Sequence, residues 1–190
     1  QKQLPTIRSR CQIVRFRELQ REQVHAVLER VLPQVSAEEI KDLAGCADGS
    51  ISQALLLKDP ELRQFRYQLY ERLAKCPLDF MELAKAVGGL ADAAGKDVGA
   101  LKRARMKIVF EFGERFYRQL LIALDGKKLG SDDMLQAKAE TAAKDYRGGR
   151  HGALACWQRC QTAAEDVDRF INQSMLIEAW AADLAKYSKA

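Results

Sequence analysis

The sequence predicts an all-α fold, and three observations support this prediction. Leucine, alanine, glutamate, lysine, glutamine and arginine dominate the composition, and these residues have high helix propensities. Only four prolines occur among 190 residues, and three of them precede residue 61. Apolar residues recur every three to four positions over most of the chain, which is the spacing of an amphipathic helix. Residues 11–16 are the exception, because they alternate weakly and predict one short residual strand near the N-terminus.

After this strand, the pattern predicts a small bundle of three short helices. The first covers residues 20–32 and ends at Pro33, since proline cannot continue a helix. Ser36 opens the second helix as the first residue of a Ser-x-x-Glu capping box. Residues 48–50, Asp-Gly-Ser, start the third helix, and residues 58–60, Lys-Asp-Pro, form the natural junction to the rest of the chain.

Longer helices are predicted in the remainder of the chain. The longest covers residues 98–125, and its wide apolar arc indicates a central position in the fold. Shorter helices are predicted at 60–75, 78–93 and 131–146, with a loop at 147–150. A final helix is predicted over 152–187, with core candidates Val167, Phe170, Ile171, Met175 and Leu176.

Composition and charge limit the classes of protein to which the chain could belong. Its 190 residues, 47% hydrophobic and 30% charged, are typical of a soluble globular protein with one core or two small ones. No window approaches about 18 uninterrupted apolar residues, so no membrane span is predicted. No signal peptide is found, although a truncated N-terminus could hide one. Five cysteines without framework spacing indicate reduced thiols, so we expect a cytoplasmic protein. The net charge of +5 permits contact with nucleic acid but does not require it.

Residues 4–12 form the most informative motif. They read Leu-Pro-Thr-Ile-Arg-Ser-Arg-Cys-Gln, which resembles the Ser-Arg-Cys motif of clamp-loader AAA+ subunits. The resemblance implies that Arg10 is an arginine finger, which reaches the ATP held by the neighbouring subunit. A guanidinium suits this role because it is always charged and presents a planar fork of donors to phosphate oxygens. Arg8 is the alternative finger, and without the motif a surface arginine at a strand end would be the commoner interpretation of Arg10.

The same resemblance divides the chain into three parts. Residues 1–10 would be the tail end of an AAA+ ATPase domain, residues 11–58 an AAA+ lid domain, and residues 59–190 a helical collar domain that holds subunits together. The resemblance is strongest over residues 1–58, whereas beyond them it rests on order, length and helicity. Residues 172–179, Asn-Gln-Ser-Met-Leu-Ile-Glu-Ala, also resemble the end of such chains, with an ordinary amphipathic helix as the alternative.

Residues 47–55 resemble the sensor-2 segment of this family, with one departure at Ser52. Motor subunits carry an arginine at this place, which contacts the phosphates of the subunit's own ATP. A serine is short and neutral and cannot make that contact. A chain with the finger but without the sensor arginine resembles the delta-prime-type subunits of the bacterial DNA polymerase III clamp loader. Such subunits generally do not hydrolyse ATP themselves but complete the site of a neighbour.

The resemblance therefore implies a subunit that assembles through its collar with gamma/tau-type and delta-type subunits. Together they would use ATP to open the sliding clamp and load it onto primed DNA. No cofactor is expected in this chain, since ATP would be bound by neighbouring subunits, and no complete active site is expected. Two alternatives remain open, namely an ATP-hydrolysing gamma/tau-type motor subunit and a helical nucleic-acid-binding module.

Other candidate sites have less support from the sequence. Cys156 and Cys160 share a helix face near His151, but no Cys-x-x-Cys pair and no fourth ligand accompany them, so no metal is expected. No phosphate-cradling Gly-x-x-x-x-Gly-Lys-Ser/Thr loop and no Ser/His/Asp set is found. Basic residues near the N-terminus could bind phosphates, but no aromatic–basic stacking pattern accompanies them. They are Arg8, Arg10, Arg15, Arg17 and Arg21.

Overall fold

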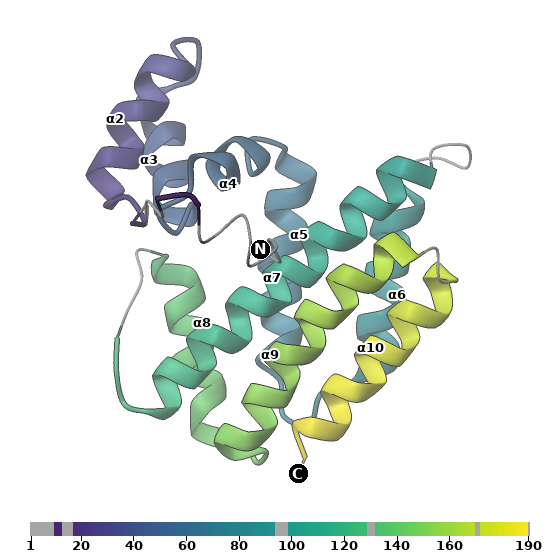
Figure 1. Cartoon of the computed structure of the whole chain (residues 1–190). Coiled ribbons are helices and arrows are strands. Elements are labelled where there is room, and N and C mark those ends of the chain that lie inside the picture. The colour runs from purple at the N-terminus through teal and green to yellow at the C-terminus, as the bar shows by residue number, and fades with distance from the viewer. Residues whose placement is uncertain (1–9, 13–16, 94–98, 129–131, 170–171, 190) are drawn as a thin grey trace.

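The part of the chain that the structure describes is almost entirely helical, which confirms the predicted all-α class (Figure 1). The computed structural model describes residues 10–12, 17–93, 99–128, 132–169 and 172–189. No strand occurs within these ranges. The predicted strand at 11–16 is not found at residues 11 and 12, and residues 13–16 lie outside the described ranges.

The helices follow one another with short connections. Side chains cap several N-termini, and Asp59 illustrates how the sequence sets such a boundary. Its carboxylate accepts a hydrogen bond from the Glu61 amide at 2.9 Å, while Pro60 occupies the first helical position. In chain order the helices are α2 (Arg21–Val31), α3 (Ala37–Cys46), α4 (Ile51–Leu56), α5 (Pro60–Leu73), α6 (Phe80–Asp92), α7 (Gly99–Leu124), α8 (Asp133–Asp145), α9 (Gly149–Asp166), the 3-10 helix η1 (Val167–Arg169) and α10 (Gln173–Tyr187).

Helices α2, α3 and α4 pack on one another at one end of the molecule, as the predicted three-helix bundle requires (Figure 1). The remaining helices surround α7, which contacts α5, α6, α8 and α9 and is as central as its wide apolar arc predicted. Phe110, Phe112 and Phe116 of α7 are fully buried. The buried apolar residues of both groups form one connected cluster, from Val24 in α2 to Ala185 in α10. None of the described helices has both the length and the apolar character needed to cross a membrane.

The prediction of a single helix over 152–187 is wrong. Helix α9 ends at Asp166, η1 follows, and α10 starts after Asn172, whose side chain accepts a hydrogen bond from the Met175 amide at 3.2 Å. A continuous helix of that length would extend roughly 50 Å and leave its apolar face unpartnered. Folding back places α10 against α9 and α6 and buries Trp180.

The outcome for the core candidates of this segment is mixed. Val167 and Leu176 are buried as predicted, but Met175 is 66% exposed. Phe170 and Ile171 lie outside the described residues. The predicted loop at 147–150 is also shorter than expected, because α9 already begins at Gly149.

The start of α9 approaches the end of α10 closely, and glycine makes this approach possible. The Gly148 amide donates to the Ser188 carbonyl at 3.1 Å. A Cβ atom added at Gly152 would collide with the carbonyl oxygen of Tyr187, which is backbone and cannot turn aside. By contrast, a Cβ atom at Gly89 in α6 would meet nothing within 4 Å.

These surroundings give opposite expectations for the same substitution. Gly152→Ala should lower the free energy of unfolding by about 1–3 kcal/mol, because the two helix ends must separate to admit the methyl group. Gly89→Ala should raise it by about 0.5–1 kcal/mol, because alanine loses less backbone entropy in a helix. Urea unfolding followed by circular dichroism would measure both. Equal effects at the two positions would show that the approach of α9 to α10 does not depend on Gly152.

Candidate functional site

Arg10 lies in a turn at the surface, ahead of the first described helix. Its side chain is exposed, and it has no ion-pair partner among the described residues. Most other arginines of the described part form ion pairs with carboxylates, as Arg63 does with Glu39 at 3.3 Å. Arg8, the alternative finger, lies outside the described residues. An exposed guanidinium without an internal carboxylate is available to an anion from outside this chain.

The turn before α4 holds the sensor-2-like segment against the chain that enters α2. Asp48 and Gly49 both have positive φ angles, of 47° and 76°. The Leu19 amide donates to the Gly49 carbonyl at 3.2 Å, and a Cβ atom at Gly49 would lie 2.8 Å from the Glu18 Cβ. Position 49 requires glycine, since a side chain there would combine a left-handed backbone with a close approach to Glu18 and Leu19.

Ser52 follows in the first turn of α4, where its side chain is exposed. The helix is capped by Ser50, whose hydroxyl accepts a hydrogen bond from the Gln53 amide at 3.3 Å. Ser52 therefore has no role in capping this helix or in the core. A hydroxyl group at this exposed position adds no positive charge that could attract a phosphate.

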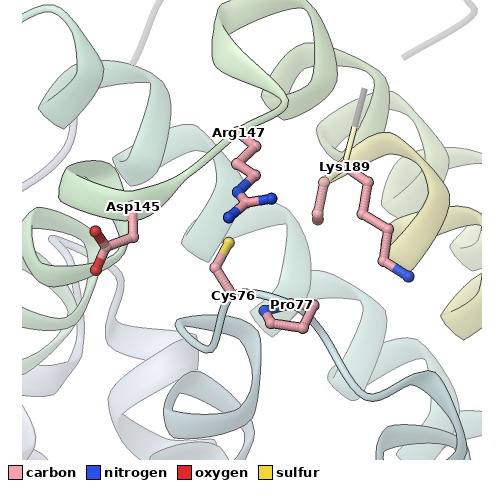
Figure 2. A pocket seen from close by; sticks show the side chains of 6 residues that line it. Cys76, Pro77, Asp145, Arg147 and Lys189 are labelled. Atoms are coloured by element: carbon pink, nitrogen blue, oxygen red, sulfur yellow. The ribbon is translucent and has the colours of Figure 1, made fainter.

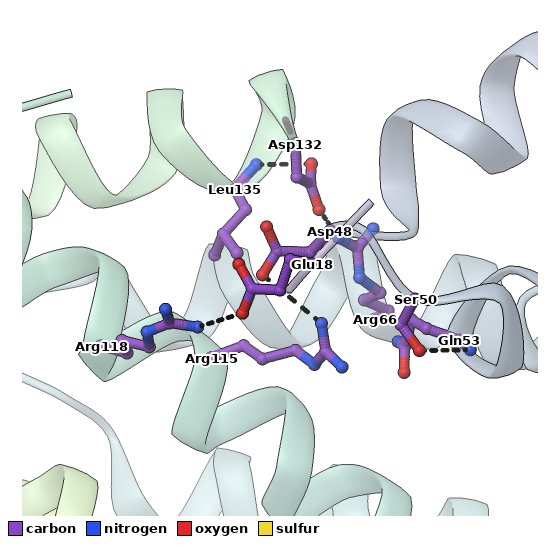
Figure 3. Close-up of polar contacts among 9 residues, drawn as sticks. All are labelled: Glu18, Asp48, Ser50, Gln53, Arg66, Arg115, Arg118, Asp132 and Leu135. Carbon is purple, nitrogen blue, oxygen red and sulfur yellow. Dashed lines mark hydrogen bonds and ion pairs between the residues drawn. The ribbon is translucent and has the colours of Figure 1, made fainter. Parts of the chain in front are cut away.

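Polar side chains gather where the α2–α4 group meets the other helices (Figure 3). Arg115 of α7 pairs with Asp48 at 3.5 Å, and Arg118 pairs with Glu18 at 3.4 Å. Arg21 in α2 similarly pairs with Asp133 in α8 at 3.0 Å. These ion pairs join segments that are far apart in the sequence. The Arg118–Glu18 and Arg21–Asp133 pairs are largely exposed and contribute little free energy, whereas the side chains of the Arg115–Asp48 pair are partly buried.

The buried member of this cluster is the ion pair between Arg66 of α5 and Asp132, which precedes α8. Their side chains are only 2% and 3% exposed. Asp132 also accepts a hydrogen bond from the Leu135 amide at 3.1 Å and so caps α8. The Arg66 guanidinium lies 4.9 Å from the centre of the Tyr70 ring. Burial raises the pKa of the Tyr70 phenol, and the charge of Arg66 partly opposes that rise.

A cavity of about 400 Å³ lies between the α5–α6 connection, the end of α8 and the residues that follow α10 (Figure 2). Cys76, Asp145, Arg147 and Lys189 line it, with Arg147 lying over the Cys76 thiol (Figure 2). Its lining mixes one carboxylate with two cations. It includes no histidine that could serve as a general base for the thiol.

The two cysteines considered as zinc ligands are buried and have structural contacts. The Cys156 thiol lies 3.5 Å from the Tyr146 hydroxyl, and Cys160 accepts a hydrogen bond from the Trp180 indole at 3.4 Å. Burial raises the pKa of both thiols, which disfavours the thiolate form that binds metals. His151 is exposed on the surface of α9 and does not join them. Within the described ranges, no three potential ligands of these types gather at one point.

The structure thus places the residues singled out from the sequence at different points. Arg10 and Ser52 are both exposed, while the zinc candidates are divided between the core and the surface. The polar cluster around Arg66 and Asp132 was not predicted, because the partners come from α5 and from the segment before α8. Comparisons with models of protein families, with curated proteins and with solved structures gave no match.

Proposed function

We propose that the chain contains the lid and the collar of a delta-prime-type clamp-loader subunit. In this proposal the α2–α4 group is the lid, and α5–α10 form the collar that assembles with gamma/tau-type and delta-type subunits. The subunit takes part in the ATP-driven loading of the sliding clamp onto primed DNA. It does not hydrolyse ATP but supplies Arg10 to the nucleotide of a neighbour.

The proposal rests on two observations taken together, an exposed arginine at position 10 and a serine instead of an arginine at position 52. Arg10 belongs to the Ser-Arg-Cys motif and is exposed without an ion-pair partner among the described residues. Ser52 is neutral and exposed at the place where a motor subunit would need an arginine. Three short helices follow the motif and a larger helical group follows them, which is the order that the resemblance implies. This combination favours the non-hydrolysing subunit over the motor subunit.

The test is assembly with partners. The 190-residue chain would be co-expressed with the gamma/tau-type and delta-type clamp-loader subunits of its source, purified through a tag on the chain, and sized. We expect a stoichiometric complex that survives moderate salt. A well-folded chain that stays alone would contradict the collar assignment. If that solitary chain bound DNA with a steep dependence on salt, the nucleic-acid-binding alternative would take its place.

A further inference from the structure

The cavity beside the α5–α6 connection contains a thiol that the proposed function does not use. Cys76 lines this cavity of about 400 Å³ and is partly exposed, so its sulfur can be reached by a small molecule from solvent. Cys156 and Cys160, by contrast, are buried. Most small-molecule sites in proteins have volumes of about 300–1,000 Å³, and this cavity lies within that range.

Three charged side chains surround the Cys76 thiol. Arg147 lies over it, and Asp145 and Lys189 lie on either side (Figure 2). Arg150 is only three positions from Arg147, but it pairs with Asp125 and not with a residue of the cavity. Among the residues that the structure describes, none forms an ion pair with Asp145, Arg147 or Lys189. The cavity therefore presents two cations and one carboxylate that are available to a ligand.

These groups together specify the chemistry of a ligand. The guanidinium and ammonium groups of Arg147 and Lys189 match carboxylates, and the Asp145 carboxylate matches an ammonium group. No histidine lines the cavity as a base for the thiol, but thiol–disulfide exchange requires only a thiolate and an accessible disulfide. A small disulfide that carries carboxylate groups and an ammonium group therefore complements all four side chains.

We propose that Cys76 is a modification site, at which a small zwitterionic disulfide of an amino-acid or peptide thiol forms a mixed disulfide with the chain. Arg147 and Lys189 hold the carboxylates of this molecule, and Asp145 holds its ammonium group. The charged side chains select the ligand, and the cavity accommodates the half of it that becomes attached.

The exchange step is balanced without a further reactant. The Cys76 thiol loses its proton to solvent, and the resulting thiolate attacks one sulfur of the small disulfide. A new S–S bond joins Cys76 to one half of the molecule, while the original S–S bond breaks. The other half leaves as a thiolate and takes up a proton. The small disulfide is thus the oxidant, since Cys76 is oxidised and the released half is reduced.

Three disulfides of different charge test the selection of the ligand. The folded 190-residue chain would be incubated with glutathione disulfide, neutral hydroxyethyl disulfide or cationic cystamine, and the modified cysteines quantified over time by peptide mass spectrometry. Cys46 is the internal control, because it is also partly exposed but does not line the cavity. We expect the rate at Cys76 relative to Cys46 to be at least about tenfold higher with glutathione disulfide than with cystamine, if each cation contributes about threefold.

Substitution of the cations tests the same selection from the side of the protein. Arg147→Gln and Lys189→Gln should each slow the reaction of Cys76 with glutathione disulfide about threefold, the size of an exposed ion pair, and leave the reaction with hydroxyethyl disulfide unchanged. Lys186→Gln is the matched control, since Lys186 is an exposed lysine in the last turn of α10 that does not line the cavity. It should change neither rate.

Asp145→Asn tests the ammonium contact by a difference in sign. It should slow the reaction of Cys76 with glutathione disulfide, because the ammonium group loses its partner. It should speed the reaction with dithiodipropionate, which has carboxylates but no ammonium group, because a repulsive charge is removed. A change in the same direction with both disulfides would show that Asp145 does not contact the ammonium group.

The remaining outcomes decide the proposal as a whole. If the relative rate at Cys76 is the same for all three disulfides, or if Arg147→Gln and Lys189→Gln leave it unchanged, the thiol reacts only as its exposure allows and the proposal is wrong. If the buried Cys156 and Cys160 are modified as fast as Cys76, exchange follows unfolding and the cavity is not the site. None of these results bears on the proposed function, which does not involve Cys76.

Discussion

Asp132→Asn should lower the free energy of unfolding by about 3 kcal/mol, the lower part of the range measured when a buried ion pair loses one partner. Asparagine keeps the shape of the side chain and an oxygen that can cap α8. It removes the negative charge opposite Arg66, whose side chain is 2% exposed. The guanidinium would then be buried without a counter-charge. Its desolvation is no longer offset, so the folded state loses stability while the unfolded state changes little.

The adjacent residue provides a matched control. Asp133 also pairs with an arginine, Arg21, at 3.0 Å, but the two side chains are 83% and 37% exposed. Asp133→Asn should therefore change the free energy of unfolding by less than about 1 kcal/mol, as surface pairs do. Guanidinium unfolding of both variants measures the difference. Equal effects of the two substitutions would show that the burial of Asp132 does not determine its contribution.

A double substitution tests the mechanism of the loss. Arg66→Met removes the charge that Asp132→Asn leaves uncompensated and keeps an apolar stem against the Tyr70 ring. We expect the double variant to be more stable than Asp132→Asn alone, because no buried charge remains without a partner. If the double variant loses as much free energy of unfolding as the two single variants lose together, the two side chains do not interact in solution.

The arrangement of the central helix could be predicted because its apolar residues are local and periodic. Phe112 and Phe116 lie one turn apart, and the wide arc around them indicated that α7 is covered on several sides. The pairing of Arg66 with Asp132 could not be predicted in this way. A charged residue counts as polar in any pattern, and its burial depends on a partner 66 positions away in the chain. Such pairs depend on tertiary packing, and the local sequence around either residue does not indicate them.

Met175 and Asn172 show a second limit of pattern reading. The apolar residues before and after η1 have nearly the spacing of one continuous helix. One long helix was therefore predicted across η1. Only Asn172 marks the new start, by capping α10, and a single asparagine is a weak signal. The residues of the candidate site also differ in whether the sequence could predict them. A motif identified Arg10, whereas the cavity that brings Cys76 close to Arg147 and Lys189 depends on tertiary packing.

Arg10→Ala in the intact subunit should lower ATP hydrolysis at the neighbouring site that it completes by about a thousandfold or more, the lower limit for arginine fingers supplied in trans. Assembly should remain intact, because Arg10 is exposed and forms no ion pair within the described residues. Arg10→Lys should be almost as inactive. An ammonium group is a point charge and cannot present two parallel donors to the transferring phosphoryl group.

The measurement is single-turnover hydrolysis in the reconstituted complex, with assembly checked by sizing in the same samples. Arg17→Ala is the matched control, since Arg17 is an exposed arginine close in sequence that lies outside the Ser-Arg-Cys motif. Arg8→Ala tests whether Arg8 rather than Arg10 is the arginine finger. If Arg8→Ala rather than Arg10→Ala stops hydrolysis, the motif is right and the finger is Arg8. If neither changes the rate in a fully assembled complex, the chain does not complete a neighbour's site. Its contribution would then be limited to assembly through the collar.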